Sequence, residues 1–196
     1  MSSKDKAHSN DTVSSGLICG PAPMENAMAM GKFTMSCYDK DGTLKWSAEE
    51  HNLVVNQGLQ YMCSVALTAG ATAQPQITAW YIGLYGAGAS NNPAAGDTLT
   101  SHAGWTEVNP YTGNRKACTF VAATTANPSV ATNTASPASF AITLAGPTIV
   151  GGAFLSSAAS GTTGTLFSAA DFSSPGDRSV VSGDTLNVTY SLSLAG

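Results

Sequence analysis

The chain has 196 residues, a length that suits one domain with an appendage and a sizeable buried core. Charged residues make up only 10% of it, well below the roughly 25% of an ordinary globular domain. The net charge of −4 and the scattered basic residues argue against a broad nucleic-acid-binding surface, and no apolar run approaches the roughly 20 residues of a membrane-spanning helix. So few charges also predict that strand edges are protected in another way, by closure of the sheet or by burial in an assembly.

Residues 1–30 are predicted to form an extended N-terminal arm. Ser, Asn, Asp, Lys, Gly and Pro dominate there, and Gly20-Pro21-Ala22-Pro23 disfavours regular structure. No apolar stretch follows the first lysines, so we do not expect a secretory signal. Short apolar patches are typical of an arm that docks a few side chains on a partner. The candidate anchors are Leu17, Ile18, Met24, Met28 and Met30.

The four cysteines include no Cys-x-x-Cys pair, so a zinc site of the usual local kind is not expected. A domain of this length also has no need of disulfide bonds for stability. We therefore expect Cys19, Cys37, Cys63 and Cys118 to be mostly reduced, and to behave as small hydrophobic residues in a protein made in the cytoplasm.

A β-hairpin is predicted at the start of the single domain that we place at residues 31–196. Apolar and polar side chains alternate on both sides of Asp39-Lys40-Asp41-Gly42, and period two around a tight Asp-Gly turn is a strong hairpin pattern. The apolar positions are Phe33, Met35 and Cys37 before the turn, and Leu44, Trp46 and Ala48 after it.

One helix is predicted next, with Asn56 as its N-cap and Gly70 at its end. Apolar residues recur at helical spacing, and polar residues occupy the other face. The apolar set is Leu59, Met62, Cys63, Ala66 and Leu67, and the polar set is Gln57, Gln60 and Ser64.

Strand patterns dominate the rest of the chain. Residues 79–85 are predicted to form a central strand covered on both faces, and residues 116–123 form a strand with Cys118 and Phe120 on one face. The apolar run over residues 148–155 contains Gly151-Gly152, which marks a bulge or bend. The last strand is expected to bury every second side chain: Leu186, Val188, Tyr190, Leu192 and Leu194.

These elements predict a mainly β fold with about seven or eight strands. We expect an antiparallel β-barrel or a jelly-roll-like sandwich, with one short helix and the extended N-terminal arm.

Several segments between about residue 50 and residue 194 carry a further pattern. They are His51-Asn52-Leu53-Val54-Val55, Trp80-Tyr81-Ile82-Gly83-Leu84-Tyr85, residues 96–107 with Tyr111, residues 164–172 and residues 182–190. The pattern resembles virion proteins of tailed bacteriophages, of the capsid-decoration (cement) type. The N-terminal arm lies outside the resemblance.

The resemblance implies a β-barrel or jelly-roll protein without a catalytic site. Such a protein sits on the capsid surface of the virion, after assembly in the bacterial cytoplasm, and ties neighbouring subunits of the phage major capsid protein together. Self-association as a homo-oligomer stays open, and neither nucleic acid nor membrane is an expected partner.

The segment at Asp97 also has a physical interpretation. Asp97 is predicted to cap one helical turn over residues 98–102, Gly104 to end it, and Trp105 to anchor it. Gly-Asp-Thr-Leu recurs at Gly183, which we interpret as coincidence and not as a repeat.

The best candidates for catalysis or metal binding are Glu49, Glu50 and His51, with Asp97 and His102. Glu49 and Glu50 point to opposite faces if the strand continues, so they cannot act together without a bend. A structural role for the two histidines is the simpler interpretation. We therefore expect no catalytic residue, no metal site and no cofactor.

A second class of function rests on the aromatic residues. Side chains of this kind line sugar-binding platforms, although in an all-β domain they more often belong to the core. The residues concerned are Trp46, Trp80, Tyr81, Tyr85 and Trp105. The alternative is therefore a receptor- or carbohydrate-binding module associated with a phage tail or fibre.

Overall fold

The computed structural model describes residues 28–70, 73–86, 92–172 and 176–196. This part of the chain forms twelve strands and one α-helix, which confirms the mainly β prediction. The elements in chain order are β1 (Met28–Tyr38), β2 (Leu44–Val54), α1 (Asn56–Leu67), β3 (Trp80–Tyr85), β4 (Glu107–Val108), β5 (Lys116–Cys118), β6 (Ser129–Thr132), β7 (Ala138–Ala141), β8 (Thr148–Val150), β9 (Gly152–Ser156), β10 (Leu166–Asp171), β11 (Arg178–Val180) and β12 (Thr185–Ala195).

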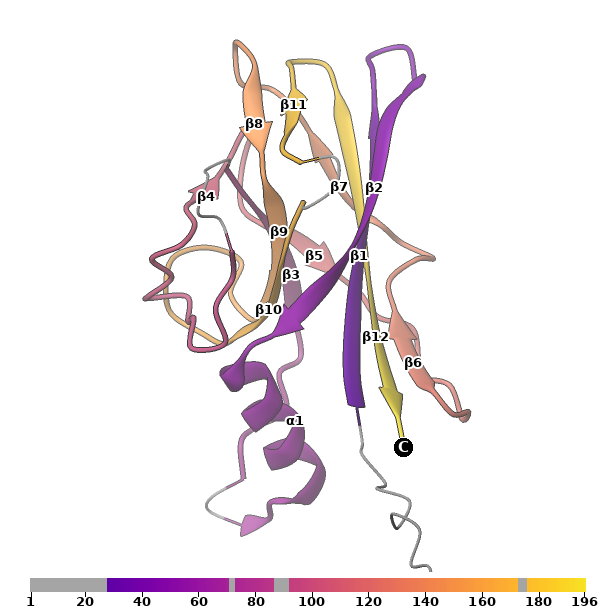
Figure 1. The fold of residues 1–196 in the computed structure, drawn as a ribbon, viewed down its shortest axis with the longest axis vertical. Coiled ribbons are helices and arrows are strands. Elements are labelled where there is room, and N and C mark those ends of the chain that lie inside the picture. The colour runs from indigo at the N-terminus through magenta and orange to yellow at the C-terminus, as the bar shows by residue number, and fades with distance from the viewer. Residues whose placement is uncertain (1–27, 71–72, 87–91, 173–175) are drawn as a thin grey trace, which may run out of the picture.

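Ten of the strands form one antiparallel sheet, in the order β4-β3-β9-β10-β2-β1-β12-β6, with β5 also paired to β3 and β7 to β12. The sheet folds over itself at β2. Most of β2 pairs with β1, but Leu53 and Val54 at its end pair with β10. The long β1, β2 and β12 therefore form one half of a sandwich, and β3, β9 and β10 form the other (Figure 1).

The segment that follows β5 joins the two free edges of this sheet. β5 pairs with β3, and further along the chain Val121 N–H donates to Thr132 O at 2.9 Å and Thr124 N–H donates to Val130 O at 3.1 Å. Thr132 and Val130 belong to β6 at the opposite edge. The sandwich thus closes toward a barrel, which protects edges that carry little charge.

The predicted hairpin is confirmed, and it begins earlier than expected. Asp39 Oδ1 accepts the backbone N–H groups of Asp41 and Thr43 at 2.9 and 2.8 Å, and Gly42 takes a left-handed φ of 80°. At the other end of β1, Met28 already pairs with Ala195 of β12. Met28 and Met30, which we assigned to the arm, therefore lie in the first strand.

The main core lies between the two halves of the sandwich, and a second cluster lies outside it. Phe33, Met35 and Phe140 are fully buried in the first. The second cluster packs Leu99 and Trp105 against the outer side of β3, β9 and β10. The central strand β3 is thus covered on both faces, as predicted.

The last strand is buried over part of its length only. Leu186, Val188 and Tyr190 are fully buried, Leu192 is half-buried, and Leu194 has 47% of its surface exposed. The prediction was wrong for Leu194. At that point β12 runs beside the start of β1, past the end of the main core (Figure 1).

The helix also differs from its prediction. Its N-cap is Val55, with no side-chain cap, and its buried residues are Gly58, Tyr61 and Ser64. A Cβ on Gly58 would lie 2.3 Å from the backbone oxygen of Phe167, so only glycine allows the helix to approach β10 this closely.

The inward polar side chains of α1 fix the chain that follows it. Tyr61 Oη accepts the N–H of Ile77 at 2.7 Å, and Ser64 Oγ accepts the N–H of Gln74 at 3.1 Å. The apolar side of the helix is turned away from the core instead. Leu59 is 43% exposed and Leu67 is 84% exposed.

Candidate functional site

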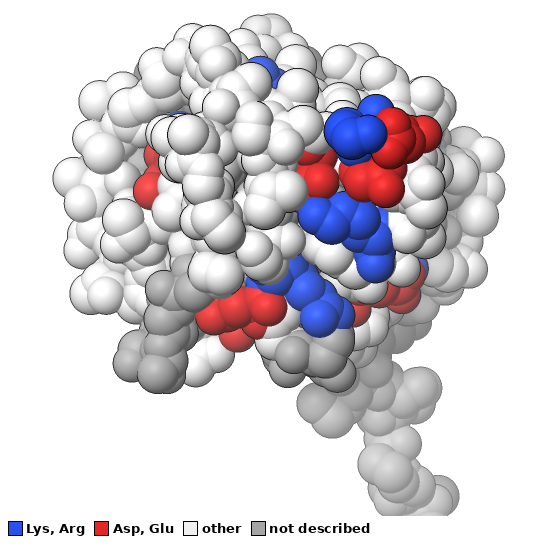
Figure 2. Space-filling model, turned by 90° about the horizontal axis from the view of Figure 1, so that it is seen from above, with Lys and Arg blue, Asp and Glu red and all other residues white. Residues whose placement is uncertain are grey.

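The two ends of the molecule differ in charge. Figure 2 looks onto the end that carries the β1–β2 turn, where basic and acidic side chains lie next to one another. Lys40 and Asp41 pair there at 2.7 Å, and Lys45 pairs with Asp184 at 2.6 Å. The opposite end is formed by α1 and the neighbouring ends of β1 and β12 (Figure 1). α1 belongs to a stretch of 45 residues, 52–96, without any Asp, Glu, Lys or Arg.

The charged end is organised around the buried Asp184. Its Oδ2 accepts hydrogen bonds from Lys45 Nζ, from the backbone of Val181 at 2.9 Å, and from Cys37 Sγ at 3.8 Å. The hydrogen bond to Asp184 raises the pKa of Lys45. Burial, followed by the charge of Asp184, raises the pKa of Cys37 to about 11. The charged and hydrogen-bonding groups of this cluster are paired with one another, so we interpret the cluster as structural.

At the uncharged end, a groove of about 390 Å³ runs along the outer side of α1. We call it the α1 groove. Its walls are Leu59, Met62, Cys63, Ala66 and Leu67 of α1, and Met28, Ala29 and Leu194 at the ends of β1 and β12.

A second apolar pocket, of about 250 Å³, lies on the inner side of α1, at the mouth of the barrel. Tyr61, Trp80, Phe120 and Leu192 are among its walls, and Met62 lines both this pocket and the α1 groove. A methionine at the boundary gives the surface an adaptable side chain. The uncharged end therefore offers two adjoining apolar depressions.

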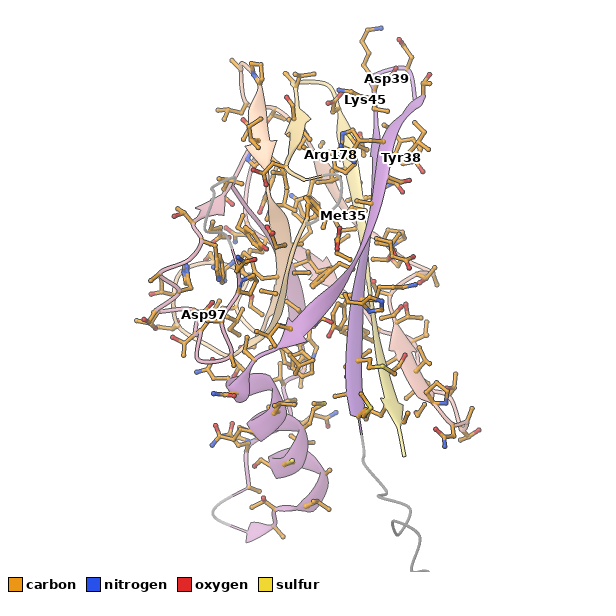
Figure 3. All side chains as sticks on the ribbon, viewed as in Figure 1. Met35, Tyr38, Asp39, Lys45, Asp97 and Arg178 are labelled. Atoms are coloured by element: carbon orange, nitrogen blue, oxygen red, sulfur yellow. The ribbon has the colours of Figure 1, made fainter. Side chains whose placement is uncertain are left out.

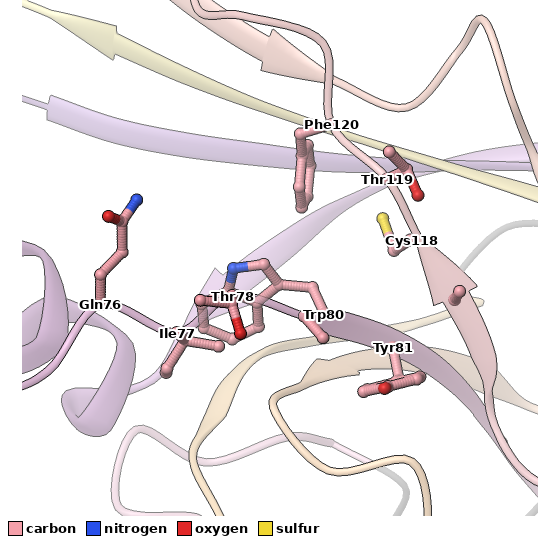
Figure 4. Close-up of a pocket in the computed structure, with 10 residues that line it drawn as sticks. Gln76, Ile77, Thr78, Trp80, Tyr81, Cys118, Thr119 and Phe120 are labelled. Carbon is pink, nitrogen blue, oxygen red and sulfur yellow. The ribbon is translucent and has the colours of Figure 1, made fainter.

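A third hollow, of about 540 Å³, lies on the flank of the barrel between residues 76–81 and residues 117–120 (Figure 4). Trp80 and Tyr81 are half-buried there, beside Gln76, Thr78 and Thr119. This combination of aromatic rings with amide and hydroxyl groups suits a polar ligand such as a sugar.

The residues expected to be the best enzyme candidates are not assembled into one site. Glu49 pairs with Lys32 at 3.0 Å, and the neighbouring Glu50 lies opposite the buried Phe33 in the β1–β2 register. The two carboxylates thus lie on opposite faces of β2, as predicted. Among the residues that the structure describes, no three His, Cys, Asp or Glu side chains are arranged to hold a metal ion.

Asp97 and His102 hold Trp105 in place. Asp97 Oδ2 accepts the indole Nε1–H at 2.9 Å, while the His102 ring stacks on the indole at 3.9 Å with its Nδ1 2.8 Å from the backbone oxygen of Trp105. Trp105 is buried and is the predicted anchor. Asp97 lies on the flank of the barrel, away from the labelled residues of the charged end (Figure 3).

The predicted helical turn after Asp97 was wrong. The carboxylate accepts the N–H of Ala94, three residues earlier, where a helix cap would bind residues further along. Asp184 makes the same turn: its Oδ2 accepts the N–H of Val181, and its own N–H donates back to Val181 O at 3.0 Å. The recurring Gly-Asp-Thr-Leu therefore marks one kind of tight turn, and its interpretation as coincidence was wrong.

The five candidate aromatic residues do not form one platform. Tyr85 and Trp105 are buried in the second core cluster, and Trp46 lies half-buried beneath the Arg178 guanidinium, 5.8 Å from its ring centre. Trp80 and Tyr81 alone line the flank hollow. These two residues are consecutive on β3, so their rings point to opposite faces of the strand, and a sugar would meet only one of the five rings at a time.

The candidate anchors fall into two groups. Leu17, Ile18 and Met24 lie outside the described residues. Met28 and Met30 are exposed on β1, and Met28 forms part of the α1 groove.

The length of α1 and the comparisons with known proteins complete the description of the site. α1, the helix that the described residues form, falls short of the length and apolar character that a membrane crossing requires. Searches of protein-family models, of curated proteins and of solved structures found no match to the chain.

Proposed function

We propose that this chain is a non-enzymatic structural component of a bacteriophage particle, which binds the major capsid protein and stabilises the shell as a decoration protein. The resemblance over residues 50–194 supports this assignment. The observation that carries it is the uncharged apolar end, to which the N-terminal 27 residues are attached at Met28.

This end has the chemistry of a protein-binding surface. A protein that works alone in water rarely gathers large apolar side chains in one exposed place. Here Met28, Leu59, Val65, Leu67 and Leu194 are each between 41% and 84% exposed. Burying the rest of these side chains is worth about 1 kcal/mol each, or on the order of 5 kcal/mol together, before the entropy of association is subtracted.

The N-terminal segment extends the reach of this surface. A chain of 27 residues spans up to roughly 90 Å when extended, enough to cross a boundary between shell subunits. Leu17, Ile18 and Met24 are its apolar anchors, and Met28 and Met30 continue them onto the domain. Contacts at both the segment and the domain resist detachment better than either alone, because the second binding event is intramolecular.

The test is binding of purified full-length protein to capsids that lack it. We expect saturable binding and a higher temperature of genome release. Val65→Asp at the uncharged end should weaken binding about tenfold or more. Val65 is exposed and lies outside the α1 groove, so this change leaves the core and the groove intact.

Lys40→Ala is the matched control. It removes an exposed charge from the opposite end, and binding should not change. Failure of the unmodified protein to bind such capsids would refute the proposal.

The flank hollow favours a second candidate, a carbohydrate-binding module of a tail or fibre. One of the two aromatic rings, Trp80 or Tyr81, would stack on a sugar ring while Gln76 and Thr119 bind hydroxyl groups. A glycan array decides between the two. Binding that is lost on Gln76→Ala and Thr119→Ala, combined with no binding to capsids, would establish the carbohydrate function.

A further inference from the structure

The α1 groove is an apolar site that this domain leaves open. Helices of this pattern ordinarily turn their apolar side to the core. Here the close approach of Gly58 to β10 and the inward hydrogen bonds of Tyr61 and Ser64 turn that side outward. None of the residues that line the groove is charged. An apolar, uncharged segment is therefore the occupant that the groove fits.

The chain itself contains such a segment. Residues 12–24 include no Asp, Glu, Lys or Arg, and the adjacent Leu17 and Ile18 are the largest aliphatic side chains within them. This segment joins the domain at Met28, which is itself a wall of the groove. Every copy thus carries both an apolar peptide and, at the same end, an apolar receptor.

Chain stiffness determines which copy the segment reaches. The sequence Gly20-Pro21-Ala22-Pro23 favours extended conformations, because proline restricts its own φ and disfavours helix at the residue before it. Over the seven steps from Leu17 to Met24, an extended chain at about 3.1 Å per residue spans about 20 Å. Ile18 lies ten residues before Met28, so in an extended chain it would be about 30 Å from this wall of the groove, and entering its own groove requires the chain to turn back. Reaching outward to another copy requires no reversal.

We infer that Leu17 and Ile18 of one copy dock in the α1 groove of a neighbouring copy, so that the chain self-associates. Each copy then donates one segment and receives one, which generates a ring when the rotation closes. The inference goes beyond the proposed function by naming the partner of Leu17 and Ile18. Leu17, Ile18 and the groove walls then link neighbouring copies and do not contact a shell directly, whereas Met24, Val65 and the barrel-mouth pocket stay available to a shell.

The cysteines make this arrangement measurable. Cys19 follows Ile18 directly, and Cys63 is exposed on the wall of the groove. The other two thiols are buried, and burial raises the pKa of Cys37 to about 11 and that of Cys118 to about 12. Cys19 and Cys63 are therefore the pair that a thiol reagent at neutral pH would join.

The first experiment treats the full-length protein with a short bifunctional maleimide and separates the products by denaturing electrophoresis. Docking between copies predicts covalent dimers and higher species, which disappear with Cys19→Ser or with Cys63→Ser. A link between Cys19 and Cys63 within one chain, identified by mass spectrometry of the monomer band, would overturn the inference.

The second experiment needs no cross-linker. Full-length Leu17→Asp/Ile18→Asp has an intact groove, whereas full-length Ala66→Asp has an intact segment. Each variant should be monomeric in sedimentation velocity at concentrations where the unmodified protein associates. A mixture of the two should form a one-to-one heterodimer, because one segment and one groove remain functional. Monomers in the mixture, or in the unmodified protein at the highest concentration tested, would overturn the inference.

Val65→Asp is the matched control. Val65 is exposed on the same helix but is not part of the groove, so association should be unchanged. No capsids are present in these experiments, so their outcome is independent of whether the protein binds a phage shell.

Discussion

Replacing Arg115 by Met tests whether a buried cation holds together the loops beside β5. The side chain is 6% exposed, and its guanidinium forms a two-pronged pair with Glu107 at 2.8 and 2.6 Å. It also donates to the backbone oxygens of Ala158 at 2.9 Å and Gly161 at 2.8 Å, and lies 4.9 Å from the ring centre of Phe154. Met preserves the apolar contact and removes all the hydrogen bonds.

The expected loss of folding free energy follows from the Glu107 carboxylate, which the substitution leaves without its partner. Breaking a buried ion pair by removing one partner costs about 3–5 kcal/mol, because the remaining charge is buried without compensation. The side chain of Glu107 is still 25% exposed and can be partly rehydrated, which places the loss near 3 kcal/mol. For a domain of this size each kcal/mol lowers the melting temperature by about 2–4 °C. Arg115→Met should therefore melt roughly 6–12 °C below the unmodified protein.

The measurement is thermal unfolding by circular dichroism, supported by urea denaturation at one temperature. Lys40→Ala is the control, because it removes an ion pair whose side chains are 76% and 68% exposed. Its effect should stay below about 1 kcal/mol. Equal melting temperatures for Arg115→Met and Lys40→Ala would refute the reasoning that burial, and not pairing alone, determines the contribution of the ion pair.

Three further predictions concern the core, pH and thiol reactivity. Val188→Asp places a carboxylate at a fully buried position of β12 and should cost about 3 kcal/mol or more, seen as insoluble protein or a much lower melting temperature. The pKa of Asp171 is raised, first by burial and then by neighbouring acidic groups. The folded state therefore binds the proton more tightly than the unfolded state, and stability should fall as pH rises from the ordinary pKa of the carboxyl through the raised one. Asp171→Asn should flatten this slope in melting curves recorded from acidic to neutral pH; an unchanged slope would contradict the assignment. Finally, a maleimide at neutral pH should label Cys63 in the folded protein and leave Cys37 and Cys118 unlabelled until denaturant is added, as mass spectrometry of peptides would show.

The elements with strict local patterns could be predicted from the sequence alone. Alternation around Asp39 to Gly42 determined the β1–β2 hairpin, because side chains of a strand point to opposite faces in turn. The same rule placed Leu186, Val188 and Tyr190 in the core. The run from Trp80 to Tyr85 predicted a strand covered on both faces. Each of these properties depends on neighbours in the chain, so the chain carries the information directly.

The direction in which α1 faces depended on the tertiary structure. Its pattern favours Leu59 and Leu67 on the inner side, yet the structure buries Gly58 and Ser64 instead. A periodicity shows that a helix has two sides, but the position of β10 decides which side can approach closely, and only the residue without a Cβ fits there.

The candidate binding surface likewise arose from packing. Met28 and Leu194 meet near the outer side of α1 because β1 and β12 pair along their full lengths, bringing the two ends of the described chain together. The 45 residues without a charged side chain were a sequence signal for an uncharged surface. Composition gives no direction in space, so only the fold could show that α1 from this stretch forms one end of the molecule, beside the point where the N-terminal segment joins.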